Sequence, residues 1–138
     1  MASPSSAPLG PLDVTKILTG KRVLFAGATG FVGKVSLSML LHHYGEELAH
    51  VYVLVRKGSA KDAKSRFFDK VATSEPFEPL RTKFGGEAEA IAWLSKKVTI
   101  LDGDITDPWM GMDETAARAL KGNIDVVINC AGLVSFNP

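Results

Sequence analysis

Three glycines in the run Gly27-Ala28-Thr29-Gly30-Phe31-Val32-Gly33 form a G-x-x-G-x-x-G pattern. The run lies between a short apolar segment and an amphipathic one, where a strand would turn sharply into a helix. The backbone N–H groups at the positive end of that helix can bind a diphosphate. We expect Gly27 to make the turn, Gly30 to admit the diphosphate and Gly33 to let the helix pack closely on the sheet. The pattern predicts a dinucleotide site, and the alternative is an ordinary glycine-rich turn.

The end of the second predicted strand indicates which dinucleotide would bind. It reads Leu54-Val55-Arg56-Lys57-Gly58 and contains no acid. An acid at this point accepts a hydrogen bond from the ribose 2′-hydroxyl of NAD, whereas an arginine accommodates the 2′-phosphate of NADP. The guanidinium of Arg56 can bind a phosphate in a fork and stack on adenine. NADP(H) is therefore favoured, and the alternative is that Arg56 and Lys57 are merely solvated.

Two further loops follow predicted strands and would reach the same edge of the sheet. Asp104 and Ile105 follow the third strand, and Ala131 and Gly132 follow the fourth. Ligands of open α/β sheets bind at the carboxyl ends of the strands. Asp104 could accept from the adenine amino group, or it could be a turn residue bonded to its own backbone. The small residues of the other loop would let the backbone approach the ribose on the adenine side.

Metal and thiol chemistry are not indicated. His42, His43 and His50 have no cysteine or acidic partner at metal-ligand spacing, so no metal site is expected. Cys130 ends a predicted buried strand, where a small inert side chain is expected rather than a nucleophile.

The elements that position these residues alternate along the chain. Short apolar runs at residues 22–26, 51–55, 98–101 and 124–129 predict strands, and residues 31–44, 59–71, 87–94 and 113–121 predict helices. In the first helix the apolar side is expected to include Val32, Val35, Met39 and Leu40, widened by Leu37, Leu41 and Tyr44, with Gly45 as the C-cap. Residues 73–86, which contain two prolines, are expected to form a surface excursion. The order predicts an α/β fold, a doubly wound, Rossmann-like parallel sheet with about four strands.

The composition excludes several classes of protein. The 138 residues carry a net charge of +1, with 46% hydrophobic and 22% charged residues, which fits one globular domain and gives no footprint for nucleic acid. Residues 1–19 are expected to be a flexible arm and residues 20–138 the NADP-binding domain. Every apolar run is too short to cross a bilayer, so no transmembrane segment is expected. The single cysteine favours a reducing compartment, and we expect a cytoplasmic location.

Several motifs of the chain together resemble the cofactor half of the fatty acyl-CoA reductases. They are the motifs quoted above, Gly20-Lys21-Arg22-Val23-Leu24-Phe25-Ala26 before the glycine turn, and Gly103-Asp104-Ile105 and Asn129-Cys130-Ala131 after it. These belong to the extended short-chain dehydrogenase/reductase group, and thioester-reductase domains are similar. Ala26 stands where a threonine is usual. The resemblance implies hydride transfer from NADPH to an acyl thioester, giving an aldehyde and, after a second hydride, an alcohol. Another extended short-chain dehydrogenase or epimerase, or a non-catalytic NADP-binding module, remains the alternative.

The resemblance also implies a proton-donating tyrosine within a Tyr-x-x-x-Lys motif, and the chain contains none. Its tyrosines are Tyr44 and Tyr52, and the residues four positions later are Leu48 and Arg56. No catalytic residue is therefore assigned. We expect these residues to be the N-terminal part of a longer reductase. The fourth strand would then be an uncovered apolar edge through which the isolated chain could self-associate.

Overall fold

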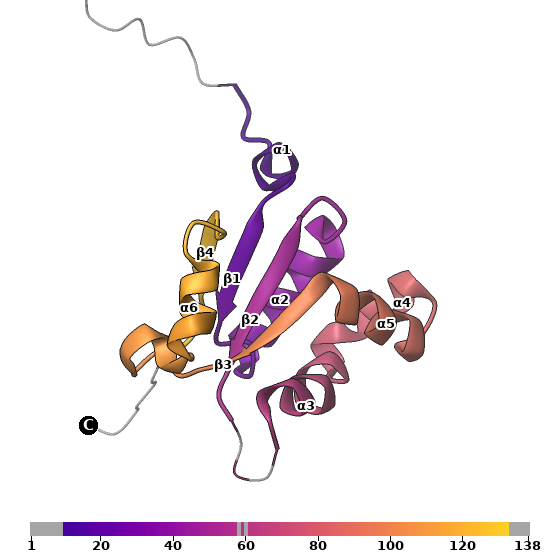
Figure 1. Cartoon of the computed structure of the whole chain (residues 1–138). Helices are drawn as coiled ribbons and strands as arrows, with labels where there is room; N and C mark the ends of the chain where they lie inside the picture. Colours follow the sequence, from indigo (N-terminus) through magenta and orange to yellow (C-terminus); the bar gives the residue numbers. More distant parts are fainter. Residues whose placement is uncertain (1–9, 58, 60, 133–138) are drawn as a thin grey trace, which may run out of the picture.

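A parallel sheet of four strands forms the centre of the molecule in the computed structural model, which describes residues 10–57, 59 and 61–132 (Figure 1). The strands are β1 (Arg22–Ala26), β2 (His50–Val55), β3 (Val98–Asp102) and β4 (Val126–Asn129). Their order in the sheet is β3-β2-β1-β4, and all three pairings are parallel. The predicted Rossmann-like fold is confirmed, because this is the order of the first four strands of that fold.

Helices and short turns connect the strands. Within the described residues, the α-helices are α1 (Val14–Leu18), α2 (Phe31–Tyr44), α3 (Ala63–Phe67), α4 (Glu78–Phe84), α5 (Glu87–Lys97) and α6 (Glu114–Leu120). Between β2 and β3, the π-helical turn η1 (Phe68–Ala72) and the 3₁₀ turn η2 (Glu75–Phe77) join α3 to α4, and the 3₁₀ turn η3 (Pro108–Gly111) follows β3. The predicted first helix has the expected bounds and the expected C-cap, Gly45.

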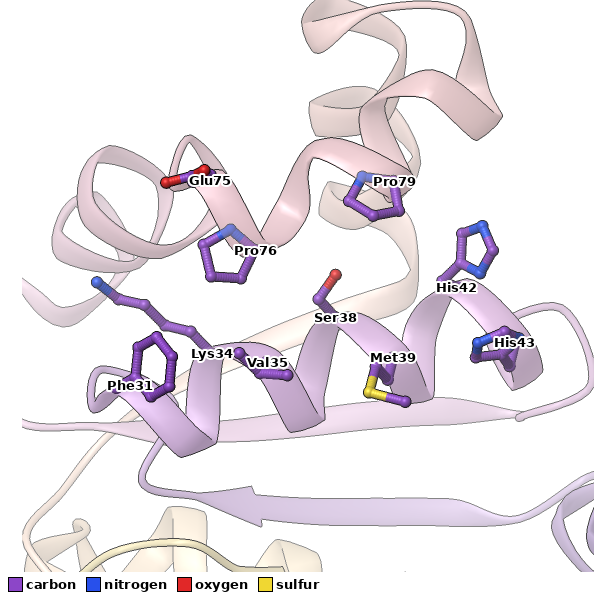
Figure 2. Close-up of a pocket in the computed structure, with 10 residues that line it drawn as sticks. All are labelled: Phe31, Lys34, Val35, Ser38, Met39, His42, His43, Glu75, Pro76 and Pro79. Carbon is purple, nitrogen blue, oxygen red and sulfur yellow. The ribbon is translucent and has the colours of Figure 1, made fainter.

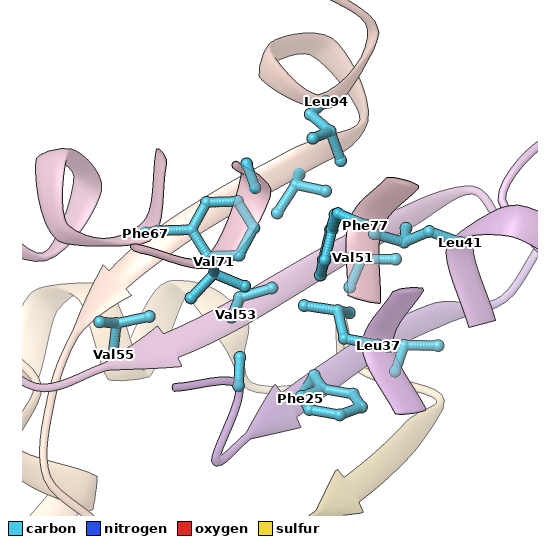
Figure 3. Packing of buried hydrophobic residues seen from close by; sticks show 14 of the residues in the cluster. Phe25, Leu37, Leu41, Val51, Val53, Val55, Phe67, Val71, Phe77 and Leu94 are labelled. Atoms are coloured by element: carbon cyan, nitrogen blue, oxygen red, sulfur yellow. The ribbon is translucent and has the colours of Figure 1, made fainter. Parts of the chain in front are cut away.

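The two faces of the sheet are covered unequally. One face carries the main core, which joins the alternating strand residues Phe25, Val51 and Val53 to side chains from α2, α3, η1, η2, α4 and α5 (Figure 3). The other face carries a small cluster of Ala26, Leu54 and Met112, with α6 packed beside it. Successive strand residues point to opposite faces, so β1 and β2 are buried on both sides.

The buried face of α2 is narrower than the predicted one. Leu37 and Leu41, expected on the apolar side, are fully buried, whereas Val32 and Met39, also expected there, are exposed. Gly33 is also buried, and residues 33, 37 and 41 follow one another at four-residue spacing on one side of the helix. The close approach of Gly33 to the end of β1 determines which side of the helix faces inward. The hydrophobicity pattern gives no information on this contact, so it could not show that Val32 and Met39 face outward.

The prediction of a surface excursion at residues 73–86 is wrong. Phe77 and Leu80 are completely buried in the main core. Pro76 and Pro79 lie in the first turns of η2 and α4, where a proline starts a helix because its missing N–H would have no partner there. Pro76 and Pro79, which were expected to lie in a loop, therefore lie at the starts of helical turns.

Two other helix starts also differ from expectation. The helix expected from Ser59 begins instead after Asp62, whose Oδ1 accepts a hydrogen bond from the Ser65 backbone N–H at 2.7 Å. Within the expected arm of residues 1–19, Asp13 caps α1 in the same manner, and Leu18 of that helix is buried. The expected arm therefore contains one short, anchored helix. An acidic N-cap defines both starts.

The strand β4 forms one edge of the sheet, with β1 as its neighbour and with Val127 exposed to solvent. This is the edge expected from the sequence, while self-association through it stays a prediction. Among the helices of the described residues, none is both long enough and apolar enough to cross a membrane.

Phe77→Ala tests the burial of the segment between η2 and α4. We expect the free energy of unfolding to fall by about 3–5 kcal/mol, because the truncation leaves a cavity in the core. Urea denaturation would measure it. Phe31→Ala is the matched control, since that ring is 79% exposed and its loss should change stability by no more than about 0.5 kcal/mol. Equal effects of the two variants would contradict the burial of Phe77.

Candidate nucleotide-binding site

The turn between β1 and α2 depends on glycine at its first position. Gly27 has φ +89°, a left-handed conformation that side chains disfavour. A Cβ atom there would also lie 2.3 Å from the Ala131 backbone nitrogen. The turn therefore lies directly against the loop after β4, and the two predicted parts of the site, Gly27 and Ala131, are in contact.

The third glycine lets the helix pack onto this turn. A Cβ atom on Gly33 would lie 1.7 Å from the Gly27 carbonyl oxygen, a distance that no side chain can occupy. The first turn of α2 is therefore held directly against the strand end. This is the close packing expected of Gly33.

The middle glycine lies at an open surface. Gly30 is the N-cap of α2, and no side chain caps the helix there. The nearest heavy atom to a Cβ on Gly30 would be the Gly27 carbonyl oxygen at 3.8 Å, an ordinary contact distance. Thr29 is half-buried, and Phe31 and Val32 are exposed at the start of the helix. The helix thus presents its N-terminal backbone to a space that an anionic group can enter.

Arg56 and Asp104, predicted from separate motifs, lie together. The Nη1 atom of Arg56 is 3.6 Å from Oδ2 of Asp104, across the carboxyl ends of β2 and β3. The Arg56 side chain is 70% exposed, so this ion pair is open to solvent and its guanidinium is accessible. Arg66 of α3 donates from Nη1 to the Arg56 carbonyl oxygen at 2.9 Å, which fixes the backbone just beyond β2.

These residues line a cavity of about 410 Å³ that has equal numbers of positive and negative side chains. Its charged side chains are three basic and three acidic residues: Arg56, Lys57, Arg66, Asp102, Asp104 and Asp107. Arg66 and Asp102 were not among the residues predicted for the site. Arg66 becomes visible only when the crossover helix is placed beside the end of β2, because its position in the sequence is that of an ordinary helical arginine.

Asp104 has the turn role that was the alternative to adenine binding. Its Oδ1 accepts from the Thr106 backbone N–H at 3.0 Å and from the Thr106 hydroxyl at 2.7 Å. These two bonds and the Arg56 guanidinium lower the pKa of Asp104 below the usual value for an aspartate. The Asp104 backbone N–H donates to the Met110 carbonyl at 2.7 Å, so the loop after β3 is firmly held. Contact with adenine stays a prediction.

The remaining predicted residues lie at the ends of the strands. Ile105 is partly exposed after β3. The Ala131 backbone N–H donates to Oδ1 of Asn129 at 2.9 Å, and a Cβ on Gly132 would meet no heavy atom within 4 Å. Cys130 packs against the main core, and its backbone N–H donates to the Ala26 carbonyl. The loop after β4 is thus anchored at Cys130 and open at Gly132.

A larger groove of about 760 Å³ lies elsewhere, between α2 and the segment that contains η2 (Figure 2). Its wall is formed along α2 by Phe31, Val35 and Met39 and on the opposite side by Pro76 and Pro79 (Figure 2). Phe31 lines this groove, so its ring belongs to the groove and only its backbone belongs to the glycine turn.

Gly33→Ala and Gly30→Ala separate the packing role from the open position. We expect Gly33→Ala to lower the free energy of unfolding by about 2 kcal/mol or more, because the new methyl group meets backbone. Gly30→Ala should stay within about 1 kcal/mol of the unchanged chain, since its φ of −78° suits alanine and space is available. Thermal and urea unfolding measure both. A larger loss for Gly30→Ala would contradict the geometry.

Comparisons with known proteins agree with this geometry. A family model described as "Male sterility protein", an NAD-binding family, matches residues 25–138. The fatty acyl-CoA reductase 1 of Xenopus laevis is 33% identical over 126 residues, covering 91% of this chain and 23% of the relative. The chloroplastic fatty acyl-CoA reductase 2 of Arabidopsis thaliana is 29% identical, covering 91% of this chain and 20% of the relative.

Solved structures with the same arrangement are reductase domains. The terminal R domain from the myxalamid PKS-NRPS biosynthetic pathway superposes with a TM-score of 0.63 at 25% identity, covering 86% of this chain and 26% of that one. The reductase domain of a nonribosomal peptide synthetase from Mycobacterium tuberculosis gives a TM-score of 0.62 at 26% identity, covering 88% and 28%. The chain thus spans between a fifth and a third of the proteins it matches. The matched family model and these relatives show that the chain belongs to the fatty acyl-CoA reductase and thioester reductase family.

Proposed function

We propose that this chain binds NADP(H) at the carboxyl edge of its sheet and supplies the cofactor-binding part of an oxidoreductase that reduces a fatty acyl thioester. The observation that carries the proposal is the pairing of an open, uncapped glycine turn with a cavity beyond β2 that holds the exposed guanidinium of Arg56. The family model supports a nicotinamide cofactor. The cofactor, when bound, supplies the hydride for the reduction.

The residues present fit such a dinucleotide along the whole edge. Gly30 and the first turn of α2 would hold the diphosphate, with Gly27 and Gly33 shaping the turn and Thr29, Phe31 and Val32 contributing backbone. The loop with Ala131 and Gly132 would face the ribose on the adenine side. Asp104 and Ile105 would lie against adenine. Apart from Gly33, which is buried under the turn, each of these positions is exposed or half-buried.

The choice of NADP over NAD follows from the charge beyond β2. Arg56 is the residue that follows the strand, and its exposed guanidinium can bind the 2′-phosphate in a fork. Lys57 and Arg66 line the same cavity and add two positive charges. A 2′-phosphate carries about two negative charges, so a ribose that bears one gains more here than a ribose with a free hydroxyl.

The acyl thioester substrate is inferred from the names of relatives, which are fatty acyl-CoA reductases. The product would be an aldehyde, or an alcohol after a second hydride. Catalytic tyrosine and lysine would come from a Tyr-x-x-x-Lys motif that is absent from these 138 residues. The cytoplasmic location inferred from the single cysteine stays a prediction.

Arg56→Asp tests the choice of cofactor. We expect NADPH binding to weaken by about tenfold to a hundredfold, because a charged hydrogen-bond donor is replaced by a repelling carboxylate. NADH binding should change by less than about threefold on the same grounds. Calorimetric titration with both nucleotides measures the effects. Arg118→Asp is the matched control, since that side chain is also 70% exposed but lies on α6. Equal weakening of NADPH and NADH would remove Arg56 from the 2′-phosphate site.

A chimaera tests the reductase role. This chain would replace the matching 126 residues of the Xenopus laevis fatty acyl-CoA reductase 1, whose remaining part would supply the rest of the enzyme. We expect NADPH-dependent formation of fatty aldehyde or alcohol from a long-chain acyl-CoA, detected by chromatography. The same chimaera with Arg56→Asp should lose activity with NADPH. A folded chimaera that binds NADPH but forms no product would contradict this role.

A further inference from the structure

Two ion pairs lie side by side in the cavity beyond β2, and the function proposed above gives no role to the carboxylate of the second pair. Besides the Arg56–Asp104 pair, Nζ of Lys57 lies 4.0 Å from Oδ2 of Asp102. Asp102 is the last residue of β3 and is in register with Val55, just before Arg56 and Lys57. Its carboxylate therefore stands directly across from the backbone that carries the two cations.

The charges of the cavity cancel in the absence of a ligand. Three cations and three carboxylates line it, so an entering phosphate meets no net positive charge. A carboxylate near the phosphate weakens phosphate binding in two ways. It repels the phosphate, and it pairs with a cation that would otherwise bind the phosphate. Asp104 is tied to Thr106 by two hydrogen bonds and has a role in holding its loop. Asp102 is the carboxylate whose neighbour is Lys57.

We infer that Asp102 is a specificity-determining residue, which competes with the 2′-phosphate of NADP(H) for the ammonium group of Lys57. This rests on the NADP(H) binding proposed above. Asp102 moderates the affinity for NADP(H) and leaves the affinity for NAD(H) unaffected, because a ribose with a free 2′-hydroxyl makes no demand on Lys57. Both partners are partly exposed, at 71% for Lys57 and 47% for Asp102, so the ammonium can exchange one anion for the other without desolvation of a buried charge.

Asp102→Asn tests the inference, because it keeps the shape of the side chain and removes its charge. We expect the dissociation constant for NADPH to fall by about threefold to tenfold and that for NADH to stay within about twofold, with the gain shrinking at high salt. Fluorescence or calorimetric titration of the chain with each nucleotide measures both constants. Asp102→Ser is a second neutral variant that also removes the carboxylate charge.

The control is Asp69→Asn, which removes a carboxylate of the same exposure, 48%, that pairs with Lys61 outside the cavity lining. It should leave both dissociation constants unchanged. A double-mutant cycle with Lys57→Met then identifies the mechanism. In the Lys57→Met background, Asp102→Asn should improve NADPH binding by less than about twofold, because the cation that it would release is absent.

The outcomes separate this inference from the function on which it depends. An unchanged chain that binds neither nucleotide overturns the proposed cofactor site and this inference with it. Selective NADPH binding that Asp102→Asn does not strengthen overturns the role of Asp102 alone. Equal strengthening for NADPH and NADH, or a full gain in the Lys57→Met background, shows general charge repulsion and overturns the competition for Lys57.

Discussion

The close approach of Gly33 to the carbonyl oxygen of Gly27, which leaves no room for a Cβ atom, is the constraint on which the carboxyl edge of the sheet depends. It holds the start of α2 against the end of β1 and leaves the helix N-terminus open at Gly30. Because Gly27 also touches the loop after β4, the same turn sets the position of Ala131. The end of β1, the start of α2 and the loop after β4 thus meet through close backbone approaches, which tolerate no side chain at either glycine.

The same contact explains how the main core is built. With Gly33 inward, Leu37 and Leu41 face the sheet, and the segments around Phe67 and Phe77 pack beside them (Figure 3). The long connection between β2 and β3 therefore completes the core on one face and also brings Arg66 to the end of β2. Packing and charge placement are linked here, because the helix whose Phe67 is buried also carries the arginine that fixes the Arg56 carbonyl.

Much of this was predictable from the sequence, and the differences have identifiable causes. The four strands, the limits of α2 and the glycine turn follow from short apolar runs and glycine spacing, which are local signals. The exposure of Val32 and Met39 on α2, the burial of Phe77 and the inclusion of Arg66 in the cavity depend on contacts between distant segments, which local periodicity does not contain. Pro76 and Pro79 misled the prediction because a proline has opposite meanings at the start and in the middle of a helix.

The charged side chains beyond β2 occur as pairs of opposite sign. A cavity with cations alone would attract any phosphate, whereas one in which Arg56 and Lys57 each have a nearby carboxylate requires an anion strong enough to replace that carboxylate. A phosphate with about two charges meets that requirement better than a hydroxyl or a singly charged group. In the proposed site, the carboxylates at the end of β3 and in the loop after it would therefore weaken the binding of weaker anions. The parallel register pairs Asp102 with Val55, so this carboxylate lies next to Arg56 and Lys57. Discrimination between dinucleotides would then arise from paired charges held by the sheet, with Arg56 as one member of the set.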